Sequence, residues 1–157
     1  MAIEMGCETY TWLMPGEEHH NLPHIMTVLN EAGFAGIEPI HITGDKFLNG
    51  LDTPEKMAEH LDKNGIKLFS LALVLDWLNP EETEAEIAEA DKMIELVSHF
   101  PGCVLMPCQM PTTRPEDPEE LKTRQDNMIK CVHAVCERAK AKGVECSYHP
   151  NSPDTSV

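Results

Sequence analysis

The stretch Glu31-Ala32-Gly33-Phe34-Ala35-Gly36-Ile37-Glu38 joins a helix-like segment to a glycine and then to a short apolar run. The same order recurs three times, with the glycine at positions 65, 102 and 143. Glycine accepts the left-handed conformation that commonly ends a helix, and each apolar run has the length of a buried strand. Alternating helices and strands of this kind predict an α/β fold with a parallel sheet.

Five strands and four helices follow from this reading of the whole chain. The strand at 67–74 is nearly all apolar in its second half, so it should be central and covered on both faces. The other strands are expected at about 3–10, 36–40, 103–106 and 144–149. The helices are expected at about 22–32, 54–64, from 80 onward and 118–142, each after a capping residue: Asn21, Thr53, Asn79 and Asp117.

Composition indicates one globular domain over residues 1–157. The hydrophobic fraction of 41% is ordinary for a folded domain. The chain has 27 acidic and 12 basic residues and a formal net charge of −15, so nucleic acid and anionic membranes are poor partners. No apolar segment reaches the roughly 18 residues of a membrane span, and the first residues lack a basic leader.

Six cysteines stand at positions 7, 103, 108, 131, 136 and 146, and no two of them have the spacing of a zinc or redox motif. Cysteines within apolar strands and helices behave as small hydrophobic residues. We therefore expect free thiols and a cytoplasmic protein.

Functional groups of a parallel α/β fold collect where the strands end, because the loops there vary over a rigid sheet. Polar side chains at such positions need partners if they are buried, which makes them good site candidates. The candidates are Glu8, Tyr10, Trp12, Glu38, His41, Asp76, Trp77, Cys108, Gln109, His149 and Asn151.

Each candidate also has a structural interpretation. Glu38 can pair with a cation or face water, whereas a buried carboxylate at a strand end favours a site. His149 can ligate a metal or bind a sugar hydroxyl. Trp12 and Trp77 suit either a platform for a sugar ring or packing at the rim of the sheet. Residues 8–12 replace the glycine-rich phosphate loop of nucleotide-binding sheets, so an open doubly wound fold is less favoured than a barrel.

Four runs in the expected order resemble the xylose isomerase-like TIM barrels, the superfamily of sugar phosphate isomerases and epimerases and of inosose dehydratase. They are residues 6–12, 33–38, 65–73 and 143–151. The resemblance covers the whole chain and implies about the first five strands and four helices of a (β/α)8 barrel, its amino-terminal half. We therefore expect a truncated barrel whose open edges lead to self-association.

The resemblance also implies a function. Complete relatives act on a small sugar or polyol, moving a proton next to a carbonyl with help from a divalent metal such as Mn, Co, Mg or Zn. It makes Glu38 and His149 the catalytic candidates, with His149 as a metal ligand where the family has glutamate, although this chain can also lack a metal. Substrate-binding candidates are Glu8, Tyr10, Trp12, His41, Trp77, Gln109 and Asn151. The alternative is a non-enzymatic sugar-binding or interaction half barrel that assembles with itself or a partner chain.

Overall fold

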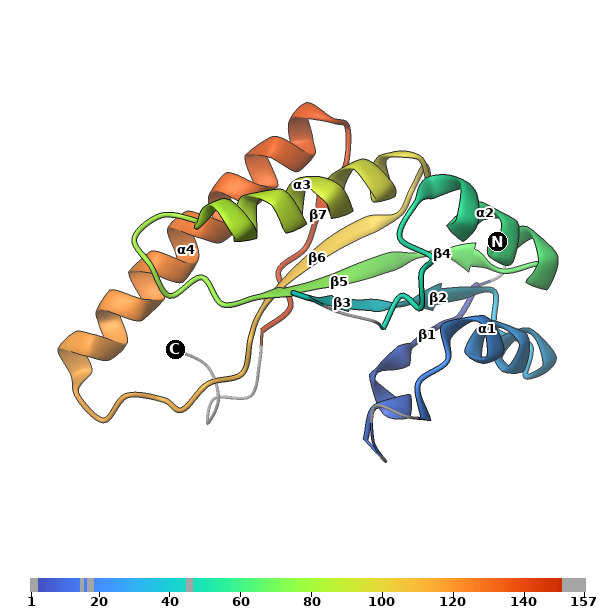
Figure 1. Ribbon diagram of the computed structural model, residues 1–157, viewed down its shortest axis with the longest axis horizontal. Helices are drawn as coiled ribbons and strands as arrows, with labels where there is room; N and C mark the ends of the chain where they lie inside the picture. Colours follow the sequence, from blue (N-terminus) through green and yellow to red (C-terminus); the bar gives the residue numbers. More distant parts are fainter. Residues whose placement is uncertain (1–2, 15, 17–18, 45–46, 151–157) are drawn as a thin grey trace.

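The computed structural model describes residues 3–14, 16, 19–44 and 47–150 (Figure 1). Strands and helices alternate along the chain, as the repeat predicts. The strands are β1 (Gly6–Glu8), β2 (Gly36–Glu38), β3 (Ile40–Ile42), β4 (Lys67–Leu68), β5 (Ser70–Leu75), β6 (Val104–Gln109) and β7 (Glu145–Cys146). The helices are the 3-10 helix η1 (Thr9–Trp12) and the α-helices α1 (Leu22–Glu31), α2 (Pro54–Asn64), α3 (Glu84–Ser98) and α4 (Pro118–Ala141).

All strand pairs are parallel, in the orders β1-β2-β4 and β3-β5-β6-β7. Only Pro39 separates β2 from β3, and only Phe69 separates β4 from β5. Backbone hydrogen bonds cross both interruptions: the Phe69 N–H donates to the Ile37 carbonyl at 3.0 Å, and the Ala72 N–H donates to the Pro39 carbonyl at 3.0 Å. The two groups of strands therefore continue each other, and the five predicted strands stand side by side in chain order.

The outermost strands differ in length from the prediction. The first was expected to reach Tyr10, but the backbone enters η1 at Thr9. The pairing of β1 with β2 stops at Glu8 and Glu38. The residue that follows β2 is Pro39, which has no N–H to donate to a neighbouring strand. At the other side, the N–H groups of Ser147 and His149 donate to carbonyls of β6 and extend the pairing beyond β7.

Three of the four α-helices start at the predicted capping residues, and the predicted glycines follow all four. The side chains of Asn21, Thr53 and Asp117 accept hydrogen bonds from the backbone of the first turns of α1, α2 and α4. The glycines at 33, 65, 102 and 143 all have positive φ angles, between 62° and 86°. The local sequence therefore sets where these helices start and stop.

The start of α3 corrects the prediction that Asn79 and Pro80 begin this helix. The helix begins at Glu84, and Thr83 and Glu86 form a reciprocal capping box. Glu86 also accepts the N–H of Trp77 at 2.7 Å, so its carboxylate holds the preceding loop in place. Asn79 and Thr83 are both possible caps for this helix. Thr83 is the one used, because its partner Glu86 also binds the loop at Trp77.

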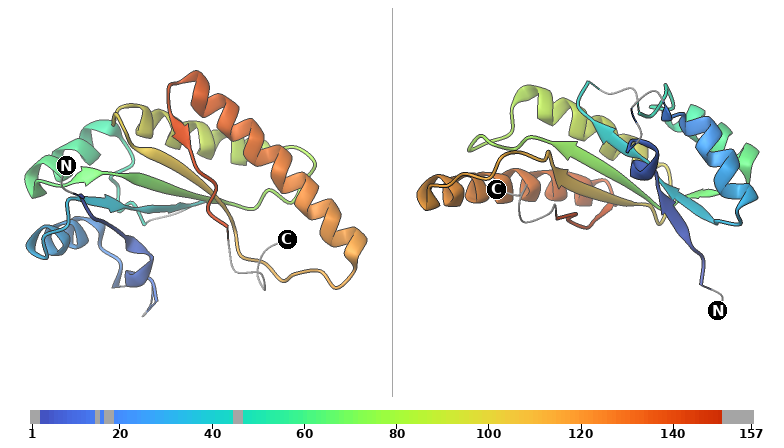
Figure 2. Two further views of the ribbon diagram at one scale, coloured as in Figure 1. Left: turned by 180° about the vertical axis from the view of Figure 1, so that it is seen from behind. Right: turned by 90° about the horizontal axis from the view of Figure 1, so that it is seen from below.

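Apolar side chains cover both faces of the sheet. The larger core lies between the sheet and the helices and includes Leu71, Leu73 and Leu75 of β5. A second cluster of Ile40, Ala72, Val74 and Cys108 lies apart from it, with Leu13, Ile42, Phe47 and Met110 packed against it. Figures 1 and 2 show α3 and α4 lying side by side along β5 and β6. Among the described residues, no helix is both long and apolar enough to cross a membrane.

Candidate functional site

Two carboxylates meet where β1 and β2 end. Glu8 and Glu38 are the last residues of these strands and are directly paired in the parallel register. Glu38 is half-buried, and the Ser70 hydroxyl from the start of β5 donates a hydrogen bond to its Oε2 atom. This hydrogen bond lets β5 fix the orientation of the Glu38 carboxylate.

Glu8 carries the electrostatic signature of this site. Neighbouring atoms cover part of the Glu8 carboxyl, and this partial burial raises its pKa above the ordinary value of 4.5. The nearby Glu38 charge raises the pKa further. His149 acts in the opposite direction and lowers the pKa of Glu8. The first, second and fifth strands of the sheet thus bring Glu8, Glu38 and His149 within electrostatic reach of one another.

Cys108 of β6 lies in the same field. Burial raises the pKa of its thiol to about 11, and the charges of Glu8 and Glu38 add to this effect. Burial and Cys108 also raise the pKa of the Tyr148 hydroxyl. The β6 strand therefore contributes a neutral thiol, and the region around His149 contributes a neutral phenol, beside the two carboxylates.

Three predicted substrate-binding residues have buried structural contacts. His41 is 4% exposed, and its Nε2 atom lies 2.8 Å from Oε2 of Glu89 on α3. Gln109 is 1% exposed and donates from Nε2 to the Asp76 carbonyl at 3.2 Å. Trp77 is 0% exposed and belongs to the core against the helices, so its ring packs there rather than offering a platform to a sugar.

The remaining predicted residues lie near the carboxylates in the sequence or outside the described part of the chain. Tyr10 and Trp12 belong to η1, which begins directly after Glu8. Tyr10 is 53% exposed, and Trp12 is half-buried against the core. Asn151 lies outside the described residues. Ligand binding by Tyr10, Trp12 and Asn151 stays a prediction.

Ser70 is the site residue that sequence reasoning missed. A signal was present, because Ser70 is the polar residue in the otherwise apolar strand Ser70–Leu75. Its importance depends on Glu38, which is far from it in sequence and lies on a neighbouring strand. The pairing of β3 with β5 and of β2 with β4 brings the two together.

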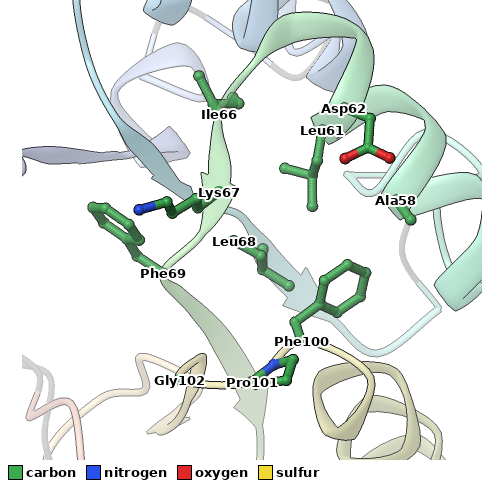
Figure 3. Close-up of a pocket in the computed structure, with 10 residues that line it drawn as sticks. All are labelled: Ala58, Leu61, Asp62, Ile66, Lys67, Leu68, Phe69, Phe100, Pro101 and Gly102. Carbon is green, nitrogen blue, oxygen red and sulfur yellow. The ribbon is translucent and has the colours of Figure 1, made fainter.

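A hollow beside the sheet lies away from the two carboxylates. Its volume is about 320 Å³, and it is lined mostly by apolar side chains from α2, β4 and the loop after α3, including Leu61, Phe69 and Phe100 (Figure 3). Ile66 and Lys67 place it at the start of β4, whereas Glu8 and Glu38 close their strands. This hollow is therefore separate from the carboxylate site.

No group of three or more His, Cys, Asp or Glu side chains within the described ranges is arranged to hold a metal ion. Glu8, Glu38 and His149 are near one another without forming such a group. The described part of the chain therefore lacks a complete set of metal ligands.

Residues 26–156 match the family of xylose isomerase-like TIM barrels. The chain belongs to this family. The architecture agrees, because strictly parallel strands in chain order, with helices between them, are what such a barrel contains. The predicted family and fold class are confirmed, and the described elements match part of a xylose isomerase-like barrel.

Solved structures of similar fold include three of this kind. The IolI protein with a bound zinc atom has a TM-score of 0.70 and 19% identity, over 99% of this chain and 54% of that one. The probable 3-DHS dehydratase AsbF from Bacillus anthracis has a TM-score of 0.63 and 15% identity, over 96% and 54%. A sugar phosphate isomerase/epimerase from Parabacteroides distasonis has a TM-score of 0.60 and 18% identity, over 95% and 51%.

The chain thus spans about half the length of the solved structures it matches. At these identities the likeness shows the fold. No curated protein sequence matches the chain significantly.

Proposed function

We propose that this chain forms the amino-terminal part of the substrate face of a sugar isomerase- or epimerase-like barrel, acting on a small sugar or polyol. The observation that carries the proposal is the Glu8–Glu38 pair, two carboxylates paired in register, in which burial and then the Glu38 charge raise the pKa of Glu8. Isomerisation and epimerisation move a proton on a carbon next to a carbonyl, and such reactions use one group that holds a proton and one that accepts it.

Different surroundings suit the two carboxylates to different roles. The raised pKa of Glu8 keeps a proton on this group to higher pH, which suits a general acid. The hydrogen bond from Ser70 orients the Glu38 carboxylate, which suits a general base. His149 stands close enough to Glu8 to affect its pKa and is placed to bind a hydroxyl of the substrate.

The zinc atom in the IolI structure supports a divalent metal in related barrels, where it would polarise a carbonyl or hydroxyl group. His149 is the ligand that this chain would contribute, as the family resemblance implies. Because the described donors do not form a complete metal site, we assign no step of the reaction to a metal.

Proton abstraction can be tested without knowing the natural substrate. The chain is incubated in D₂O with a panel of aldoses, ketoses and inososes, and proton NMR follows exchange of the C–H next to the carbonyl. We expect exchange with at least one compound, a loss of at least tenfold in Glu38→Gln, and normal exchange in Glu31→Gln, an exposed change at the end of α1. Equal exchange in Glu38→Gln and the unmodified chain would contradict the assignment.

The alternative is a sugar-binding module without catalysis. Its support is that the described residues contribute carboxylates and a histidine but no complete metal site. Calorimetry with Mn²⁺ and Co²⁺ and with polyols separates the two functions. Intact polyol binding with millimolar or weaker metal binding favours the module, whereas micromolar metal binding favours the enzyme.

We also propose that the chain self-associates through its sheet edges. Within the described residues, β1 and β7 each pair with a strand on one side only. Ile3 and Met5, just before β1, are 93% and 64% exposed. An open edge with apolar neighbours favours pairing with another chain. Light scattering at several concentrations should show dimers or larger species, and a monomer throughout would contradict this.

A cytoplasmic location stays a prediction.

A further inference from the structure

Cys136 and Cys146 form a pair of neighbouring thiols between α4 and β7. A short turn at Gly143 joins this helix to this strand and lets β7 lie against the end of α4 (Figure 2). Both side chains line the same hollow, and Cys136 contributes to the raised pKa of the Cys146 thiol. Both cysteines are half-buried, whereas Cys103, Cys108 and Cys131 are buried.

Small solutes can reach this pair. Cys136 and Cys146 line one hollow of about 390 Å³, together with Glu137, Lys140 and Glu145, whose side chains are exposed. Partial exposure of both thiols gives a small disulfide access to them, and access is one of the conditions for thiol–disulfide exchange. A disulfide between them requires side-chain rotation that brings the two sulfurs to a separation of roughly 2 Å.

We propose that Cys136 and Cys146 are a site of reversible oxidation, at which a low-molecular-weight disulfide such as oxidised glutathione converts the two thiols to an intramolecular disulfide. In the first step one thiol, as its thiolate, attacks the glutathione disulfide, forms a mixed disulfide and releases one reduced glutathione. In the second step the other thiol attacks the protein sulfur and releases the second glutathione. The protein loses two electrons and two protons, which convert the glutathione disulfide to two thiols.

The disulfide would join the end of α4 to the last strand of the sheet. The backbone after β7 continues its pairing through the N–H groups of Ser147 and His149, so a cross-link at Cys146 anchors this segment close to its pairing residues. Burial and Cys136 raise the pKa of the Cys146 thiol to about 12, so exchange at neutral pH is slow and becomes faster as the pH rises. The thiol pair and its oxidation do not depend on the proposed sugar chemistry.

The test uses the full chain equilibrated in buffers of reduced and oxidised glutathione, followed by alkylation of free thiols and trypsin digestion. Cleavage after Lys130, Arg138 and Lys142 puts Cys136 and Cys146 on different peptides. We expect a cross-link between these peptides that disappears on adding dithiothreitol. The oxidised chain should have a midpoint of thermal unfolding higher by roughly 5 °C.

Cys131 shares the peptide of Cys136, so two variants decide which sulfur reacts. The cross-link should persist in Cys131→Ser and be absent from Cys136→Ser. Fragmentation of the cross-linked peptides from the unmodified chain gives the same assignment if a variant fails to fold. Absence of the cross-link in the most oxidising buffer, or its assignment to Cys131, would overturn the proposal.

Discussion

The ring of Phe69 lies directly on the backbone of Gly36. A Cβ atom placed on Gly36 would come within 2.5 Å of the Cγ and Cδ2 atoms of this ring, and one on Gly6 would come within 2.7 Å of Cδ2. Phe69 is the residue that interrupts the third strand between β4 and β5. The missing side chains on the first two strands thus leave the space that the ring of the third strand fills.

Gly36→Ala should therefore destabilise the fold by about 1–3 kcal/mol, because the new methyl group overlaps the central atoms of the Phe69 ring rather than a mobile tip. Urea unfolding measures the change. The same substitution in a Phe69→Leu background should cost clearly less, since the smaller side chain can move aside. Equal costs in both backgrounds would show that the ring is not the cause.

Glu86→Ala should lower the free energy of unfolding by about 2 kcal/mol, because the substitution removes the acceptor for the N–H groups of Trp77 and Thr83. Glu86 is 7% exposed, so water replaces the lost acceptor poorly. Glu84→Ala, an exposed change in the same helical turn, is the control and should cost less than about 0.5 kcal/mol. Similar losses in both variants would contradict a special role for Glu86.

Arg138→Met should cost about 2 kcal/mol, because it leaves the buried Glu82 carboxylate without its two-pronged partner. Arg138 donates to the two Glu82 oxygens at 2.6 and 2.9 Å and to Asp91 at 2.7 Å, and these contacts raise its pKa further above the ordinary range. The matched change Lys122→Met removes an exposed pair with Asp126 and should cost less than about 0.5 kcal/mol. Thermal unfolding of the two variants tests the difference.

Stability should depend on pH through Glu8. Its folded-state pKa is raised above 4.5, so between that value and the higher folded-state pKa the native chain holds a proton that the unfolded chain has lost. Stability from this group is full below pH 4.5 and falls as the pH rises through the folded-state pKa. Glu8→Gln should therefore be more stable than the unmodified chain at pH 7 and lack this loss.

Unfolding of Glu8→Gln and the unmodified chain in urea at pH 4 and pH 7 tests this dependence. The stabilising effect should be confined to the higher pH, and Glu31→Gln should show no comparable difference between the two. A stabilisation of Glu8→Gln that is the same at both pH values would exclude the titration of Glu8 as its cause.

Local sequence was enough for the elements whose signals are local. The caps at Asn21, Thr53 and Asp117 rest on side chain-to-backbone contacts within a few residues, and the glycines after the helices rest on their own positive φ angles. The predicted start of α3 at residues 79–80 was wrong. A second cap signal, Thr83 with Glu86, is used instead, because Glu86 also accepts the N–H of Trp77 in the preceding loop.

The predicted site residues fall into two groups in the structure. Glu8, Glu38 and His149 were predicted because they end strands, and the structure brings them within electrostatic reach. His41, Trp77 and Gln109 were predicted on the same ground, but their contacts are with α3, the core and the Asp76 carbonyl. Position at a strand end does not reveal which face a side chain takes, since a single interruption such as Pro39 or Phe69 changes the alternation that follows it.

The sequence by itself determined the parallel α/β architecture and the order of the units, because glycine-terminated helices and apolar strands repeat along the chain. The family followed from the resemblance of four runs of residues. Only the tertiary structure decided that Ser70 holds Glu38, that Phe69 lies on Gly36 and that Cys136 and Cys146 line one hollow. The physical reason is that these relationships join different strands and helices. Their geometry depends on strand register and side-chain packing, which no local pattern encodes.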